Sequence, residues 1–281
     1  CNTTFKARGG NGDFYMVGEM LDDCDKVAPY YAGLPALFDF SFWYKLKWAL
    51  QNNTGLYFAH DIISMQSAYS QYRTDYIEAT KLSNHDEDRA GSDLDKPKEK
   101  MKLAAAVLMT SQGHPYIYQG EELGYWGTKS RGDEYVRAPI IWDRSSTNTA
   151  TAGVNGKYDS GMLTKAMSVE AQSEDNNSVL SVYRYFTKLR NAHPALASGK
   201  MSKHPDYDEN RQTDKNIAAW FIEGDGEKLL VVHNFGNTQY DAFFHEDLSQ
   251  AVGLHGTASA YKTADTWKLT LGAYSSVIFR Q

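Results

Sequence analysis

Apolar and polar positions alternate in blocks along the first two thirds of the chain, and these blocks predict strands followed by helices. The apolar block at 13–20 predicts a buried strand. A loop, a short strand and a helix are predicted over 21–53. Two more strands are predicted at 75–86 and 115–124, where apolar and aromatic residues give way to Gly, Asn, Asp and Glu.

Two further helices have clear start and stop signals. In the first, Asp95 can act as the cap, Pro97 lies in the first turn, and Gly113 ends the apolar spacing. The second covers 178–192 and is stopped by the proline that follows His193. Strands that alternate with helices predict a parallel α/β architecture. Polar residues at the carboxyl ends of these strands place the functional site there.

The pattern changes twice after the third predicted strand. Residues 125–177 are polar and weakly periodic, which predicts an extended loop with little regular structure. From residue 199 onward, short apolar stretches alternate with Gly-Asp-Gly and Gly-Asn turns, a pattern typical of antiparallel strands. The sequence therefore predicts an α/β domain over 1–198 and an all-β domain over 199–281.

Composition narrows the classes of ligand. The chain has 29 Lys and Arg against 35 Asp and Glu, a net charge of −6. Such a chain is poorly suited to binding nucleic acid or an anionic membrane surface. Aromatic residues make up 13% of it, which favours a neutral polar ligand such as a sugar. No apolar run approaches the length of a membrane span. The 2 cysteines have no metal-binding spacing, and we predict no metal site within this chain.

The segment "KLSNHDEDRAGS" (81–92) crowds ionisable residues together directly after a predicted strand. Taken alone, such a cluster predicts a solvated loop. Here it is the second of three strand ends that occur in the order "MVGEM", "KLSNHD" and "GHPYIYQGEELG", followed by Arg-x-Pro-x-x-Trp-Asp at 137–143. These motifs resemble the later signature regions of the α-amylase family of glycoside hydrolases. In that family they close the fifth, seventh and eighth strands of the barrel.

This resemblance implies a specific fold for nearly the whole chain. Residues 1–198 would form strands five to eight, the C-terminal half of a TIM (β/α)8 barrel. The segment "LRNAHPALASG" resembles the last barrel helix, and a Greek-key β-sandwich follows it in the family. The wording of "NHDEDRAGSDL" and "YIYQGEELGYWGTK" is most similar to the surface α-amylases of Bacteroidetes starch-utilisation systems.

The resemblance also implies roles for the residues that match its motifs. Glu19, at the end of an apolar strand, would be the general acid/base, and burial near other carboxylates would raise its pKa. Asp86 would bind ring hydroxyls of the glucose unit that is cleaved. Substrate contacts are expected from five more residues: Asn84, His85, Tyr125, Trp126 and Arg137. A structural salt bridge is the alternative role for Arg137.

One required residue is absent. A retaining glycosidase needs a second carboxylate as nucleophile, and in this family it belongs to a Gly-x-Arg-x-Asp pattern upstream of the Gly-Glu strand. Residues 1–18 hold no such pattern, and Arg73 and Asp75 lie downstream of Glu19, which is the wrong order. The chain also lacks an initiator Met and a signal peptide. We therefore expect a longer enzyme, in which the missing N-terminal half of the barrel supplies the nucleophile.

The function implied is hydrolysis of α-1,4-glucosidic bonds of starch and maltooligosaccharides with retention, performed by an enzyme of which this chain is a part. This chain alone is expected to be inactive. The alternatives are neopullulanase-like or glucanotransferase activity, or a non-catalytic glucan-binding fragment. No cofactor is predicted here, and any calcium site is left to the missing part. Because starch is too large to enter a cell intact, a secreted or cell-surface location is expected from the resemblance.

Overall fold

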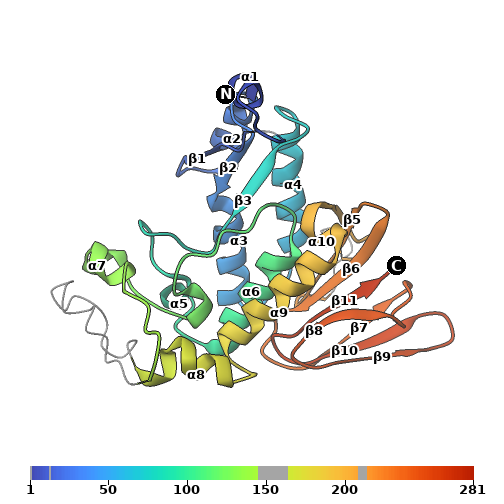
Figure 1. Ribbon diagram of the computed structural model, residues 1–281. Helices are drawn as coiled ribbons and strands as arrows, with labels where there is room; N and C mark the ends of the chain where they lie inside the picture. The colour runs from blue at the N-terminus through green and yellow to red at the C-terminus, as the bar shows by residue number, and fades with distance from the viewer. Residues whose placement is uncertain (1, 13, 145–163, 208–213) are drawn as a thin grey trace.

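The computed structural model describes residues 2–12, 14–144, 164–207 and 214–281, and Figure 1 shows them in two parts. The first part combines a small parallel sheet with the helices that cover it. The second part, coloured orange to red in Figure 1, is built of antiparallel strands. The predicted fold class, half of a barrel followed by a β-sandwich, is confirmed.

A three-stranded parallel sheet forms the centre of the first part. Its order is β1 (Val17–Gly18), β2 (Ala36–Asp39) and β3 (Ile77–Thr80). Past the end of β3, Lys81 makes a parallel bridge with Tyr116, which places the segment after Gly113 in the position of a fourth strand. All the carboxyl ends therefore lie at one edge of the sheet, where ligand sites form in parallel α/β folds.

Two strand predictions were too long. The predicted strand at 13–20 shortens to β1, and Phe14 and Tyr15 before it are exposed. The predicted strand at 115–124 is reduced to the bridge at Tyr116, and its end forms the short 3-10 helix η2 (Glu121–Leu123). Both segments lie at open edges of the half-barrel. Each segment has a neighbouring strand on one side only, so half of the backbone hydrogen bonds that would extend it as a strand cannot form.

The helices form where the apolar spacing and the caps place them. In α9 (Val179–Ala192) the side chain of Ser178 accepts the N–H of Ser181, and the helix stops at His193, as predicted. In α6 (Lys98–Thr110) the cap position is Pro97, so the predicted Asp95 cap is wrong; Asp95 has a left-handed backbone that turns the chain into the helix. The other helices are α1 (Asn2–Ala7), α2 (Cys24–Val27), α3 (Phe40–Gln51), α4 (Phe58–Ser70), α5 (Ala90–Asp93), α7 (Asp133–Val136), α8 (Val169–Glu174) and α10 (Pro194–Ser198), with 3-10 helices η1 (Ala28–Ala32), η3 (Lys129–Arg131) and η5 (Lys165–Met167).

The predicted loop at 125–177 contains more structure than its weak periodicity indicates. The short helices η3, α7, η5 and α8 occur in it, whereas 145–163 lie outside the described residues. These helices hold only one or two turns, so they show no sustained apolar stripe that a sequence pattern could reveal.

Two sheets make up the second part. One has the order β4 (Lys200–Lys203), β5 (Ile217–Gly224), β6 (Glu227–Asn234), β11 (Ser276–Arg280) and β8 (Ala251–His255). The other has the order β7 (Tyr240–Phe244), β10 (Trp267–Leu271) and β9 (Ala258–Lys262). Residues of both sheets that are fully buried form one core between them, among them Val232, Phe244 and Leu269.

A shared core joins the two parts. The ring of Phe58, at the start of α4, lies 6.0 Å from Trp220 and 5.6 Å from Phe235 of the β-part. The fully buried His233 lies between Thr110 at the end of α6, at 3.1 Å, and Ser276 of β11, at 2.7 Å. The β-part therefore packs against α4 and α6, two of the helices of the first part.

Candidate active site

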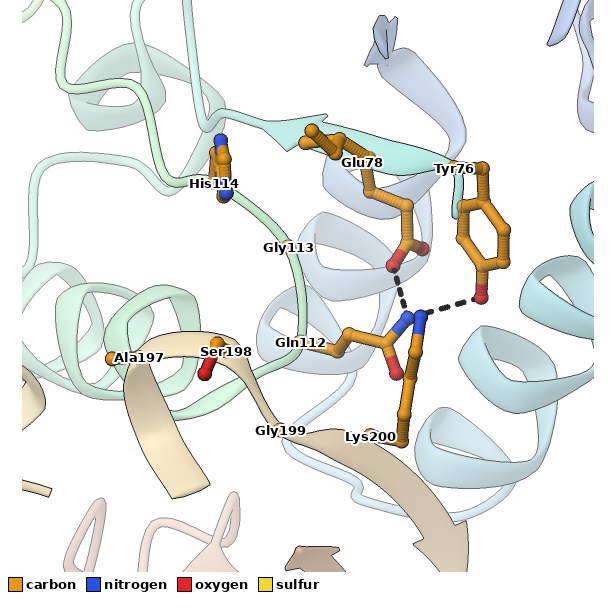
Figure 2. Close-up of a pocket in the computed structure, with 10 residues that line it drawn as sticks. Tyr76, Glu78, Gln112, Gly113, His114, Ala197, Ser198, Gly199 and Lys200 are labelled. Atoms are coloured by element: carbon orange, nitrogen blue, oxygen red, sulfur yellow. Dashed lines mark hydrogen bonds between the residues drawn. The ribbon is translucent and has the colours of Figure 1, made fainter. Parts of the chain in front are cut away.

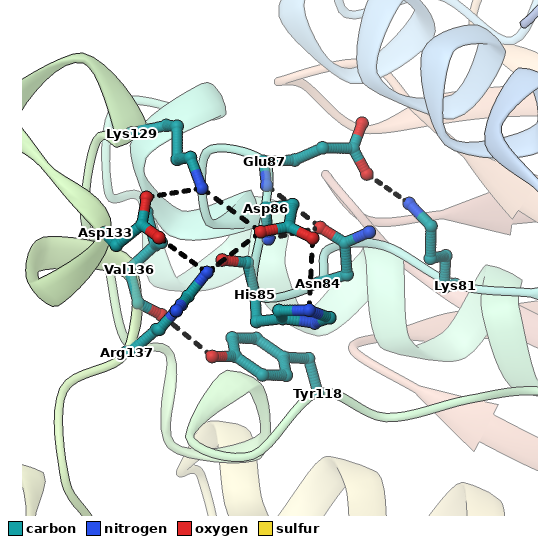
Figure 3. Close-up of polar contacts among 10 residues, drawn as sticks. All are labelled: Lys81, Asn84, His85, Asp86, Glu87, Tyr118, Lys129, Asp133, Val136 and Arg137. Atoms are coloured by element: carbon teal, nitrogen blue, oxygen red, sulfur yellow. Dashed lines mark hydrogen bonds and ion pairs between the residues drawn. The ribbon is translucent and has the colours of Figure 1, made fainter. Parts of the chain in front are cut away.

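The turn that follows β3 presents Asn84, His85 and Asp86 at the carboxyl edge of the sheet, and Figure 3 shows their surroundings. The side-chain oxygen of Asn84 accepts the backbone N–H groups of Asp86 and Glu87, each at 2.9 Å. An Asn side chain that binds its own turn in this way fixes a tight reversal of the backbone. The Asp86 carboxylate faces Lys129 and Arg137 (Figure 3), and its side chain is 49% exposed.

Three cationic or imidazole groups surround the Asp86 carboxylate. Its Oδ1 lies 2.9 Å from Nη2 of Arg137 and 3.2 Å from Nζ of Lys129, and its Oδ2 lies 3.1 Å from Nε2 of His85. The hydrogen bond from Lys129, with smaller contributions from His85 and Arg137, holds the pKa of Asp86 below its ordinary value. Asp86 is therefore ionised at neutral pH and presents an acceptor for hydroxyl groups.

Lys129 and Asp133 were missed by the sequence analysis. Asp133 accepts from Lys129 at 2.6 Å and from Arg137 at 2.7 Å, so it holds both cations against Asp86. The Lys-x3-Asp-x3-Arg spacing over 129–137 is the signal that could have identified them, since residues four apart face each other on helical turns. Arg137 also donates from Nε to the backbone oxygen of His85 at 3.1 Å. The salt bridge that was the alternative for Arg137 is thus formed with the candidate site itself.

Glu19 lies directly after β1 and is exposed. β1 and β3 flank β2, so the strand ends that carry Glu19 and Asp86 are two strand spacings apart, roughly 10 Å. The expected burial of Glu19 is not found in the described residues. β1 lies at the edge of the sheet with one neighbouring strand, and Phe14 and Tyr15 before it are exposed as well. Glu19 and Asp86 share an edge of the sheet without touching.

Tyr125 is a correction to the predicted substrate contacts. It is 1% exposed, and its ring packs in a small cluster with Leu123, Ala138 and Leu180. Its hydroxyl accepts the backbone N–H of Ile141 at 3.0 Å. The ring also lies against Gly120, where an added Cβ would come within 2.6 Å of it.

Trp126 is partly buried against the same cluster, and the ammonium of Lys96 lies 5.0 Å from the centre of its ring. One face of this ring is therefore already occupied by a cation. This arrangement leaves Trp126 a weaker candidate for stacking on a sugar than its position after a strand indicated.

Two buried ionisable side chains, Glu121 and Arg89, connect the segments beside the candidate site. Glu121 accepts the hydroxyls of Tyr183 at 2.6 Å and Ser83 at 2.8 Å, and burial raises its pKa to about 7. Arg89 is 1% exposed, donates to the backbone oxygen of Gln119 at 2.8 Å, and lies 4.5 Å from the centre of the Tyr118 ring. These contacts tie the segment after β3 to the segment that occupies the fourth strand position.

A small cavity of about 100 Å³ lies at the opposite, amino end of β3 (Figure 2). Glu78 lines it, with Gln66 at 3.0 Å and Gln112 at 3.4 Å from its Oε2. Burial, and then the neighbouring Asp39 carboxyl, raise the pKa of Glu78 well above its ordinary value. The cavity is separate from Asp86, and its buried polar contacts serve the packing of β3 against α4.

Among the described residues, no three His, Cys, Asp or Glu side chains are grouped closely enough to hold a metal ion. Within the same residues, no helix has the length and apolar content needed to cross a membrane.

Comparison with known protein families identifies the class. Residues 2–199 match the model of the α-amylase catalytic domain, and residues 217–278 match that of the α-amylase SusG C-terminal domain. The chain belongs to the α-amylase family. It is 51% identical over 280 residues to alpha-amylase SusG of Bacteroides thetaiotaomicron, a match that covers 99% of this chain and 40% of that protein. The predicted resemblance is thereby confirmed.

Two more matches agree with this. Alpha-amylase 3 of Dictyoglomus thermophilum is 29% identical over 270 residues, which cover 95% of this chain and 51% of that protein. The crystal structure of the alpha-amylase from H. orenii has the same fold, with a TM-score of 0.83 and 23% identity over 100% of this chain and 55% of that one. The chain thus spans about half the length, or less, of the relatives it matches.

Proposed function

We propose that the chain is the acid/base half of a retaining α-amylase that hydrolyses α-1,4-glucosidic bonds of starch and maltooligosaccharides. The observation that carries the proposal is the ionised Asp86, held on an Asn-His-Asp turn at the same sheet edge as Glu19, in a chain that belongs to the α-amylase family. The family membership supports the substrate class, because family members act on glucans.

Glu19 would act on the leaving group. In a retaining glycosidase one carboxyl protonates the glycosidic oxygen and later removes a proton from water. Glu19 is exposed in the described chain, so it is reached by solvent and by a bound glucan alike. Closure of the barrel by the missing strands would bury it and raise its pKa, the condition a general acid needs.

Asp86 would act on the ring of the glucose unit. As the ring flattens toward an oxocarbenium-like state, its hydroxyls become better donors, and an ionised carboxylate strengthens its hydrogen bonds to them. Arg137 and Lys129 hold Asp86 ionised for this task. His85, 56% exposed beside Asp86, would bind the same sugar from its side. Asn84 would act through the turn that it caps, and Trp126 would be a further contact for the glucan.

The nucleophile would come from the other half of the barrel. The relatives that match over nearly the whole of this chain are about twice its length or more, which supports a preceding segment that carries it. The partners proposed are therefore an α-glucan and that segment. A calcium site, if the complete enzyme has one, is proposed for the same segment, and a location outside the cell or at its surface follows from the size of starch.

The test is hydrolysis by the complete enzyme, that is, the polypeptide in which the preceding segment is present. Starch and maltoheptaose are offered, and the first products are followed by NMR. The proposal predicts α-anomers and no activity from residues 1–281 alone. β-Anomers would contradict retention. Preference for pullulan over starch would favour the neopullulanase-like alternative, and longer oligosaccharides formed from maltoheptaose would favour glucanotransfer.

A further inference from the structure

Lys81 is a lysine in an unusual place, and the proposed chemistry gives it no role. Its side chain is 2% exposed at the end of β3, five residues before Asp86. The ammonium lies 3.9 Å from the centre of the Phe40 ring, at the start of α3, and forms an ion pair with Oε2 of Glu87 (Figure 3). A buried ammonium is costly unless it is paired, so this geometry is strongly held.

Glu87 is the partner that connects Lys81 to the turn. Its side chain is 15% exposed, and its Oε1 accepts the hydroxyl of Tyr44 from α3 at 3.1 Å. Its backbone N–H donates to the Asn84 side chain, as does the N–H of Asp86. The turn is thus fixed at both ends, by Asn84 within it and by the Lys81–Glu87 pair, which anchors it to β3 and α3.

We propose that Lys81 and Glu87 are positioning residues for Asp86, which they orient toward the sugar without touching it. The proposal rests on the role of Asp86 given above. Asp86 is the residue directly before Glu87, so freeing the Glu87 side chain lets the turn rotate about Asn84. A carboxylate displaced by about 1 Å can cost a reaction about 100-fold, while a substrate bound through many other contacts is held almost as before. The pair therefore acts on kcat more than on KM.

The chain offers a matched control for lost stability. Lys102 on α6 is also a buried lysine, with 0% of its side chain exposed, paired with Glu99 at 2.9 Å and with Asn177 at 2.7 Å. Neither of these two contacts involves the turn after β3. Lys102→Met therefore removes a buried ammonium from the same half-barrel and leaves the surroundings of Asp86 intact.

The experiment compares Lys81→Met, Glu87→Gln, the double variant and Lys102→Met in the complete enzyme, with kcat, KM and Tm measured on maltoheptaose. We expect each single change at the pair to lower kcat by about 10- to 100-fold with KM within about threefold. The kcat of the double variant should stay within about threefold of that of the less active single variant, since the two single changes remove the same contact. Lys102→Met should lower Tm and keep kcat within about twofold of the unchanged enzyme.

Several results would overturn the proposal. It fails if Glu87→Gln, a change that keeps the side-chain shape, leaves kcat unchanged in an active enzyme. It also fails if Lys102→Met lowers kcat as much as Lys81→Met at equal Tm, or if the two changes at the pair multiply independently. An unchanged enzyme that cleaves no α-glucan would instead contradict the proposed function, so the two failures are distinguishable. If Lys81→Met does not fold, Glu87→Gln decides.

Discussion

The guanidinium of Arg137 lies 2.9 Å from the Asp86 carboxylate, although 51 residues separate them along the chain. The contact joins the turn after β3 to the loop beyond η2, and Asp133 holds the arginine in place from the other side at 2.7 Å. Because both cations on Asp86 come from this loop, the loop controls the charge of the carboxylate at the candidate site.

Replacing Arg137 by Met in the complete enzyme should therefore move the pH profile. Arg137 is one of the groups that lower the pKa of Asp86, so its removal raises that pKa and Asp86 takes up a proton at higher pH. We expect kcat/KM to fall about 10-fold and its acid limb to shift to higher pH. Arg144→Met is the control, because Arg144 pairs with Glu174 at 2.6 Å instead. If the acid limb lies at the same pH in the Arg137→Met and Arg144→Met variants, Arg137 does not set the charge of Asp86.

Tyr125→Phe should affect stability and leave substrate binding unchanged. The change removes the acceptor for the buried N–H of Ile141, which costs about 1–3 kcal/mol of unfolding free energy. Urea unfolding measures this loss, and KM for maltoheptaose should not move. A higher KM at unchanged stability would restore the original expectation that Tyr125 contacts the sugar.

Glu121→Gln should change how stability depends on pH. Burial raises the pKa of Glu121 from 4.5 to about 7, so its contribution is full below 4.5 and is lost as pH rises through 7. Gln lacks this titration. The stability of the variant relative to the unchanged protein should therefore increase by up to about 3 kcal/mol between about pH 4.5 and about pH 8. A difference that stays constant over this range would mean that Glu121 does not hold its proton in the folded protein.

His233 should make the junction of the two parts sensitive to acid. Burial, and then the neighbouring His255, lower the pKa of His233 from 6.5 to about 3. A lowered folded pKa gives stability that is present above pH 6.5 and is lost as pH falls toward 3. His233→Gln should be less stable at neutral pH, since Thr110 and Ser276 lose a well-placed partner, but its Tm should decline less between neutral pH and about pH 4. Parallel declines in the two proteins would contradict this.

Much of the fold and part of the site could be predicted from the sequence. The strand and helix alternation, the helix α9 and the all-β part follow from local patterns of apolar residues. Asp86 was identified because the ordered strand-end motifs resemble those of the α-amylase family, whereas the polar cluster taken alone predicts only a solvated loop. Glu19 was identified in the same way, but its predicted burial depended on neighbours that the chain does not contain.

The remaining features depend on tertiary contacts. Lys129 contacts Asp86, and Asp133 contacts Lys129, only because the loop beyond η2 folds back, and no pattern around residue 86 indicates this. The local charge pattern alone predicts that Arg89 pairs with a nearby acidic residue, Glu87, Asp88 or Asp93. It binds the backbone of Gln119 instead, because the turn buries it between β3 and the following segment. The strand lengths at the two open edges of the sheet depend on hydrogen-bond partners that the described residues do not supply.

The central claim, that Glu19 is the acid and Asp86 the transition-state stabiliser, is tested most directly by changing the leaving group. Glu19→Gln and Asp86→Asn are compared in the complete enzyme on maltoheptaose and on an α-maltosyl fluoride, whose leaving group needs no proton. Both variants should lose several orders of magnitude in kcat on maltoheptaose. On the fluoride, Glu19→Gln should recover much of the rate of bond cleavage, and Asp86→Asn should recover little. A folded Glu19→Gln variant with near-normal turnover of maltoheptaose would contradict the assignment.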